Sequence, residues 1–184
     1  MPITAAPPPA RARTLIHPGP FNPVRISSMH SDRGRHFRLV LQPGRSLYDS
    51  IVEPLRVLGV RSASMTLLGG SFAQLWYCVA GPDDTQRIVA AYSAPIDAGR
   101  AWMVFGNATL GLGAGGAPLV HCHAVFRDAR GAVKGGHILC DRVLVDAAPL
   151  TVLVTTLDGF ELRVAHDAET DIPLLGPKAL ADHG

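Results

Sequence analysis

The sequence predicts an α+β fold in which a mainly antiparallel β-sheet, curled toward a barrel, packs with one principal helix. Two observations support this prediction. One amphipathic segment near the start of the 184-residue chain has helical spacing. After residue 60, short β-prone runs alternate with separators rich in glycine, proline and aspartate. With 47% hydrophobic and 17% charged residues, the chain can bury a sizeable core.

Three segments are expected along the chain. Residues 1–35 are expected to form an arm rich in proline and arginine, partly disordered, with the run Pro7-Pro8-Pro9 near its start. Residues 36–166 hold the α+β domain, and residues 167–184 form a C-terminal tail.

The helix is expected after a first strand at residues 38–41 and a turn at residues 42–44. Ser46 is suited to the N-cap, with Asp49 at the third helical position, and Gly59 marks the end. Pro54 predicts a kink or the start of a second short turn. The apolar stripe of this helix consists of Leu47, Ile51, Val52, Leu55 and Leu58.

The rest of the domain is expected to be strands, at residues 61–68, 72–80, 87–93, 101–110, 119–127, 133–145, 150–157 and 160–165. The glycine-rich run at residues 111–116 partly matches a dinucleotide-binding loop. That loop needs a helix after it, whereas Pro118 and a β-prone run follow here. A flexible hairpin or a subunit-contact loop is the better interpretation.

The charge distribution bears on nucleic-acid binding. The net charge is only +2, but residues 1–36 carry five arginines and one aspartate, a balance of +4, which leaves −2 for the remainder. Attraction to a phosphate backbone would therefore come from the arm. Arg33-Gly34-Arg35 is similar to the core of a minor-groove AT-hook, but His36 replaces the usual proline, which favours an exposed turn.

No apolar run is long enough to span a membrane, and the N-terminus lacks the apolar stretch of a secretory signal. The three cysteines, Cys78, Cys122 and Cys140, have no C-x-x-C spacing and fit reduced thiols. A cytoplasmic protein without membrane partners is expected.

The main candidate site is a pair of strands that carries three of the eight histidines. His121 and His123 alternate with Cys122 and so project to the same face of a strand. Residues 128–131, Asp-Ala-Arg-Gly, predict a three-residue hairpin loop with a left-handed glycine, so that residue 128 faces residue 132. Counting back in this register puts His123 directly opposite His137, with His121 diagonal to it.

Three convergent imidazoles with an open position are the usual form of a catalytic zinc site. The alternative is a set of unrelated polar residues on a solvated sheet face, and a one-residue slip would move His137 to the other face. Gly135 should share the face of His137 and leave room there for a ligand or water. A β-bulge or a tight backbone contact explains this glycine equally well.

The histidine hairpin resembles the signature of the PPC (plants and prokaryotes conserved) domain. The matching residues are His121-x-His123-Ala124 and then Asp128-x-x-Gly131-x-Val133-x-Gly135-Gly136-His137. Gly44, the run Leu68-Gly69-Gly70-Ser71 and the pair Gly106-Asn107 fit the same family. The resemblance covers about residues 36–157.

The resemblance implies a compact α+β homotrimer with zinc or another divalent metal ion at His121, His123 and His137. Plant relatives join this domain to AT-hooks and bind DNA, which makes DNA a further candidate partner. The fold is also similar to that of acetolactate decarboxylase, whose zinc is held by an H-x-H and a later histidine. The family places a glutamate near position 149 or 150, where this chain has Pro149-Leu150.

Two functions follow from these patterns. The first is a metal site that binds or acts on a small oxygen-rich ligand, such as a hydroxy or keto acid, with a metal-dependent lyase or hydrolase activity left open. Arg45, Arg100 and Arg127 are candidates to hold a carboxylate. Glu169, within the acidic residues 167–171, could replace the missing glutamate, including from a neighbouring subunit, or belong to a solvated tail.

The second function is DNA binding or regulation through the basic arms of a trimer. A structural trimer whose metal only fastens the hairpin is a third interpretation, against which the space left by Gly135 counts.

Overall fold

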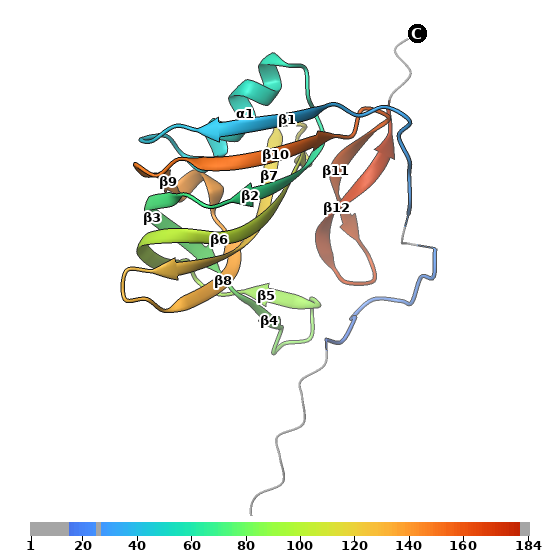
Figure 1. Ribbon diagram of the computed structural model, residues 1–184. Helices are drawn as coiled ribbons and strands as arrows, with labels where there is room; N and C mark the ends of the chain where they lie inside the picture. The colour runs from blue at the N-terminus through green and yellow to red at the C-terminus, as the bar shows by residue number, and fades with distance from the viewer. Residues whose placement is uncertain (1–14, 25–26, 181–184) are drawn as a thin grey trace, which may run out of the picture.

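The computed structural model describes residues 15–24 and 27–180 (Figure 1). Predictions for the proline run and for the last four residues lie outside this part of the chain. The elements, in chain order, are β1 (His36–Leu41), α1 (Leu47–Val57), β2 (Ala63–Leu68), β3 (Ser71–Cys78), β4 (Ala80–Pro82), β5 (Ala90–Tyr92), β6 (Ile96–Leu112), β7 (Pro118–Asp128), β8 (Val133–Ile138), η1 (Cys140–Arg142), β9 (Leu144–Val145), β10 (Leu150–Thr156), β11 (Phe160–Asp167) and β12 (Ile172–Ala179).

The predicted α+β class is confirmed. One large, almost entirely antiparallel sheet has the strand order β1-β10-β2-β6-β7-β8-β3-β9, and α1 lies against it. Strand β3 also pairs with β6, so the sheet bends back on itself. It is partly ring-like but does not close into a barrel. Figure 1 shows the helix at one edge of this curved sheet.

The helix forms where the capping pattern predicts it. The Ser46 side chain accepts a hydrogen bond from the backbone N–H of Asp49 at 2.9 Å, which satisfies one of the unpaired donors of the first turn. Pro54 lies inside the helix without ending it. Leu47, Ile51 and Leu55 are fully buried against the sheet.

The two faces of the sheet differ in what covers them. Along β7, Val120, Cys122, Ala124 and Phe126 are buried in the core, whereas the residues between them are half-buried or exposed. His121 and His123 therefore lie on the outer face, opposite the core. This alternation is the period of two that a strand with one covered face requires.

Several expected strands have different bounds. Gly99, expected in a separator, lies inside the long strand β6, where a register shift against β3 accommodates its positive φ of 62°. Residues 133–145, expected as one strand, are divided into β8, η1 and β9. Of residues 87–93, only Ala90–Tyr92 are a strand, because the side chain of Asp83 accepts hydrogen bonds from the backbone of the preceding loop.

The end of the chain forms a separate hairpin. Strands β11 and β12 pair with each other and join the ladder of the main sheet at one bridge, Arg163 to Leu112. The interpretation of residues 167–171 as a solvated acidic segment is wrong for Glu169 and Thr170, which are only 6% and 5% exposed. They are covered because the N-terminal segment packs on this turn, with the N–H of Gly19 donating to the carbonyl of Glu169 at 2.9 Å.

Among the described residues, no helix has both the length and the apolar character needed to cross a bilayer.

Candidate metal centre

The turn between β7 and β8 sets the register of the histidines. The N–H of Asp128 donates to the carbonyl of Ala132 at 2.9 Å, and the N–H of Gly131 donates to the carbonyl of Asp128 at 3.0 Å. Gly131 has the predicted left-handed conformation, with φ of 85°. His123 consequently pairs directly with His137, as the turn chemistry predicts.

Asp128 holds this turn together. Its Oδ1 atom accepts hydrogen bonds from the backbone N–H groups of Arg130 and Ala132, both at 2.9 Å. Its Oδ2 atom lies 2.7 Å from Nζ of Lys134. Lys134 and the two N–H groups hold the pKa of Asp128 below its ordinary value.

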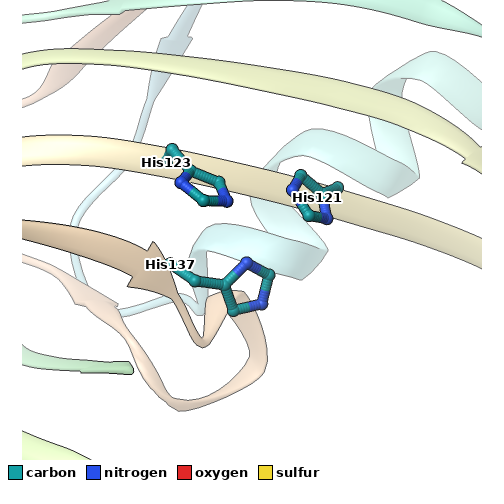
Figure 2. A group of neighbouring side chains, drawn as sticks. All are labelled: His121, His123 and His137. Carbon is teal, nitrogen blue, oxygen red and sulfur yellow. The ribbon is translucent and has the colours of Figure 1, made fainter. Parts of the chain in front are cut away.

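The three imidazoles gather on the outer face of the sheet. Ring centroids are 4.9 Å apart for His121 and His123, 4.8 Å for His121 and His137, and 5.3 Å for His123 and His137. One nitrogen from each ring lies within 4.8 Å of the others. Figure 2 shows the rings turned toward one shared space, two from β7 and one from β8.

The site favours neutral histidines. Burial, followed by the nearby charges of His121 and His123, lowers the pKa of His137 to about 4. Burial, followed by His123, lowers the pKa of His121. At neutral pH both rings are therefore unprotonated and offer lone pairs, which is the form that binds metals.

One atom tests whether these residues fit a metal ion. Nδ1 of His137 is buried and has no hydrogen-bond partner among the described residues. A buried nitrogen without a partner lowers the stability of the fold, unless an ion or another bound group satisfies it. The span of 4.8 Å exceeds the roughly 3.4 Å between two nitrogens on tetrahedral zinc. Small rotations of the side chains would close this difference. The residues fit a three-histidine metal site.

A family model covers the segment that holds the three histidines. The model of the Plants and Prokaryotes Conserved (PCC) domain, the family also written PPC, matches residues 29–158. The chain belongs to the PPC domain family. No curated protein matches the sequence.

Solved structures share the PPC fold with this chain. A metal-containing protein from Archaeoglobus fulgidus superposes with a TM-score of 0.63 at 18% identity, over 83% of this chain and 99% of that one. A putative DNA-binding protein from Ralstonia eutropha has a TM-score of 0.60 at 20% identity, over 80% and 94%. A plant- and prokaryote-conserved protein from Pyrococcus horikoshii has a TM-score of 0.60 at 18% identity, over 84% and 99%.

Of the predicted pocket residues, Gly135 lies at the PPC histidine site. It pairs with Val125 and lines a shallow outer groove of about 360 Å³ together with Phe105, Asn107 and His123. A Cβ atom at position 135 would meet the carbonyl of Ala124 at 3.0 Å, so the glycine serves close strand packing as well as space.

The other predicted pocket residues lie elsewhere in the same chain. Arg45 is paired with Glu53 of α1 at 2.7 Å. Glu169 lies in the β11–β12 turn, 2.5 Å from Nδ1 of His17, and accepts the N–H of Asn22 at 2.9 Å. Arg100 and Arg127 both pack on the ring of Trp102. Within one chain, the structure brings none of these four to the histidines.

Two residues of the site were not predicted. Asn107 pairs directly with His123 across β6 and β7, and the ring of Tyr92 lies 5.0 Å from that of His137. Asn107 fits the family pattern as part of the pair Gly106-Asn107 but was not predicted as a site residue. Tyr92 arrives from a distant hairpin, for which the sequence carried no local signal. At the position where the PPC family places a glutamate, Leu150 is fully buried in the core.

Proposed function

We propose that this PPC-domain protein binds one divalent metal ion, zinc in the first instance, through His121, His123 and His137. We further propose that the ion holds a small oxygen-rich ligand such as a hydroxy or keto acid. The observation that carries the proposal is the buried, unpaired Nδ1 of His137 within a group of three imidazoles. The fold-related protein described as metal-containing supports it.

The chemistry of the site follows from its residues. A bound divalent ion supplies a Lewis acid that polarises a carbonyl or lowers the pKa of a water molecule. Imidazole ligands carry no negative charge and would hold such an ion without neutralising its charge, which favours an anionic ligand. The side chain of Asn107 can donate a hydrogen bond to a ligand oxygen, while Phe105 and Val125 offer apolar contact beside it.

A lyase or hydrolase reaction would also need a group that moves a proton. The group of candidate metal ligands among the described residues consists of histidines alone. The proposal therefore commits to metal and ligand binding, and a catalytic role depends on a proton-transfer group from the ligand, the solvent or a second copy of the chain.

Metal binding is tested by loading purified protein with zinc, removing excess ion and measuring metal per chain. The native protein should retain one ion, and His121→Ala, His123→Ala and His137→Ala should each lose it. His36→Ala is the control, because this exposed strand histidine bonds Thr155 and lies away from the three. Metal retained by all three variants would refute the assignment. A thermal-shift screen of hydroxy and keto acids on loaded and stripped protein then tests the ligand.

We also propose that the chain forms a homotrimer through the outer face of the sheet. One row of paired residues crosses five strands there, and its four large apolar members are 39–45% exposed: Val40, Leu68, Phe105 and Val125. An apolar strip of this kind on an uncovered sheet face is typical of a contact surface. Light scattering should give a trimer for the native chain and a monomer for Phe105→Glu. Val57→Glu, an exposed apolar position on the helix, should remain trimeric.

DNA binding through the arm is the second candidate. Proteins of the same fold from Ralstonia eutropha and Bacteroides thetaiotaomicron are described as putative DNA-binding proteins. Arg35 is paired with Asp158 at 3.1 Å, and the arm also carries Arg11, Arg13, Arg25 and Arg33. Duplex binding should weaken steeply with salt and disappear when these four are changed to alanine. Binding that survives the change would refute the arm as its source.

We place the protein in the cytoplasm. Its three cysteines are all buried and free, as is usual where thiols stay reduced.

A further inference from the structure

The small hairpin β4–β5 reaches the metal centre from outside the main sheet. Figure 1 shows it beside β8. Its last residue, Tyr92, places an aromatic ring 5.0 Å from the ring of His137, with 40° between the two planes. No other aromatic ring contacts the three histidines in the described part of the chain. Neither the proposed metal coordination nor the proposed ligand binding uses this contact.

The position of Tyr92 is fixed by hydrogen bonds at both ends of the hairpin. At its base, the N–H of Ser93 donates to the carbonyl of Val79 at 2.8 Å, and the N–H of Val79 donates to Oγ of Ser93 at 3.2 Å. Val79 directly follows Cys78, which pairs with His137 across β3 and β8. Near the tip, the N–H of Val89 donates to the carbonyl of Thr170 at 2.9 Å. The hairpin is therefore held between the strand beside His137 and the C-terminal hairpin.

Metal binding by His137 requires a contact that fixes the orientation of its imidazole ring. The imidazole can turn about its last side-chain bond, and its two broad orientations present different nitrogens to the metal. Metal-binding histidines are usually fixed by a hydrogen bond from the second ring nitrogen. In the described part of this chain neither nitrogen of His137 has a hydrogen-bond partner. The ring of Tyr92, which packs on His137, can fix the orientation of this imidazole instead.

We infer that Tyr92 is a positioning residue of the metal centre: by packing on His137, its ring keeps that imidazole turned toward His121 and His123. The inference rests on the proposed metal binding. The hydroxyl of Tyr92 makes no hydrogen bond within the described residues, and the side chain is 55% exposed. The ring, and not the hydroxyl, supplies the effect. Tyr92→Phe should therefore preserve the site, and Tyr92→Ala should damage it.

The test is a Co²⁺ titration followed by visible absorption, which reports both affinity and coordination geometry. Tyr92→Ala should weaken Co²⁺ binding by roughly 10–100-fold, the usual cost of losing a group that orients a metal-binding histidine. Its absorption bands should also change shape. Tyr92→Phe should match the native protein. Arg87→Ala is the control, because Arg87 lies in the loop of the same hairpin and its side chain donates a hydrogen bond to Thr85, not to the histidines.

The outcomes separate this inference from the proposed function. Native affinity and an unchanged spectrum in Tyr92→Ala, with binding lost in His121→Ala, would overturn the role of Tyr92 alone. Equal weakening in Tyr92→Phe and Tyr92→Ala would overturn the argument that the ring acts. A native protein that binds no Co²⁺ would refute the metal proposal and this inference with it. Circular dichroism of each variant confirms that the fold is retained.

Discussion

Replacing Gly136 with alanine probes how closely the proposed metal centre depends on strand packing. Gly136 lies in β8 between Gly135 and His137, and β8 runs beside β3. A Cβ atom at this position would overlap the carbonyl oxygen of Cys78 and would lie 2.9 Å from Cδ2 of Tyr77. The first obstacle is backbone and cannot rotate away, so β8 has to move off β3 and carry His137 with it.

The expected cost follows from overpacking. Inserting a methyl group into a tightly packed position costs about 1–3 kcal/mol of unfolding free energy. For a chain of this length each kcal/mol corresponds to a fall in Tm of about 2–4 °C. Gly136→Ala should therefore lower the Tm by several degrees, and it should weaken zinc binding because the displaced His137 no longer meets the other two rings.

Calorimetry and a zinc titration measure the two effects. Gly176→Ala is the matched control, since it lies in β12 with no atom within 4 Å of the added Cβ. The control should melt and bind zinc like the native protein. If Gly136→Ala behaves like this control in both assays, the close approach of β8 and β3 does not position His137, and the reasoning is refuted.

Two other predictions concern the support of the hairpin. Phe126 is fully buried on the inner face of β7 and packs edge-on against Tyr77 at 5.0 Å, so Phe126→Ala should lower the unfolding free energy in urea by about 3–5 kcal/mol. A loss of only about 0.5 kcal/mol, which is typical of surface substitutions, would contradict its place in the core. Because Lys134 and two backbone N–H groups lower the folded pKa of Asp128, its ionised form stabilises the fold above the unfolded pKa, and this contribution is lost as pH falls through the lowered value. The unfolding free energy of Asp128→Asn should therefore fall less steeply than that of the native protein as pH drops below the ordinary pKa of an aspartate. Identical pH profiles of the two proteins would contradict the pairing of Asp128 with Lys134.

The sequence was most informative where local chemistry determines geometry. Asp128 and Gly131 specify a turn of known length, and that turn alone brings His123 opposite His137. The alternation of His121 with buried Cys122 fixes the face. The helix was predictable for the same reason, because Ser46 and Asp49 form its cap within four residues.

Contacts between distant segments escaped prediction. Tyr92 reaches His137 because β4–β5 folds back beside β3, a placement that no spacing in residues 80–92 encodes. Glu169 is buried because the segment around Gly19 happens to pack on its turn. Gly99 resembled a separator, since the register shift that admits it into β6 depends on the partner strand. In each case tertiary pairing overrode a local signal.

X-ray absorption spectroscopy of the zinc-loaded protein tests the central claim most directly. Three imidazole nitrogens at about 2.0–2.1 Å, with their outer ring atoms visible in the spectrum, are the predicted first shell. Cys122 lies between two of the proposed ligands but faces the core, so sulfur should be absent. Sulfur scattering near 2.3 Å, or a shell of oxygen without imidazole, would contradict the account.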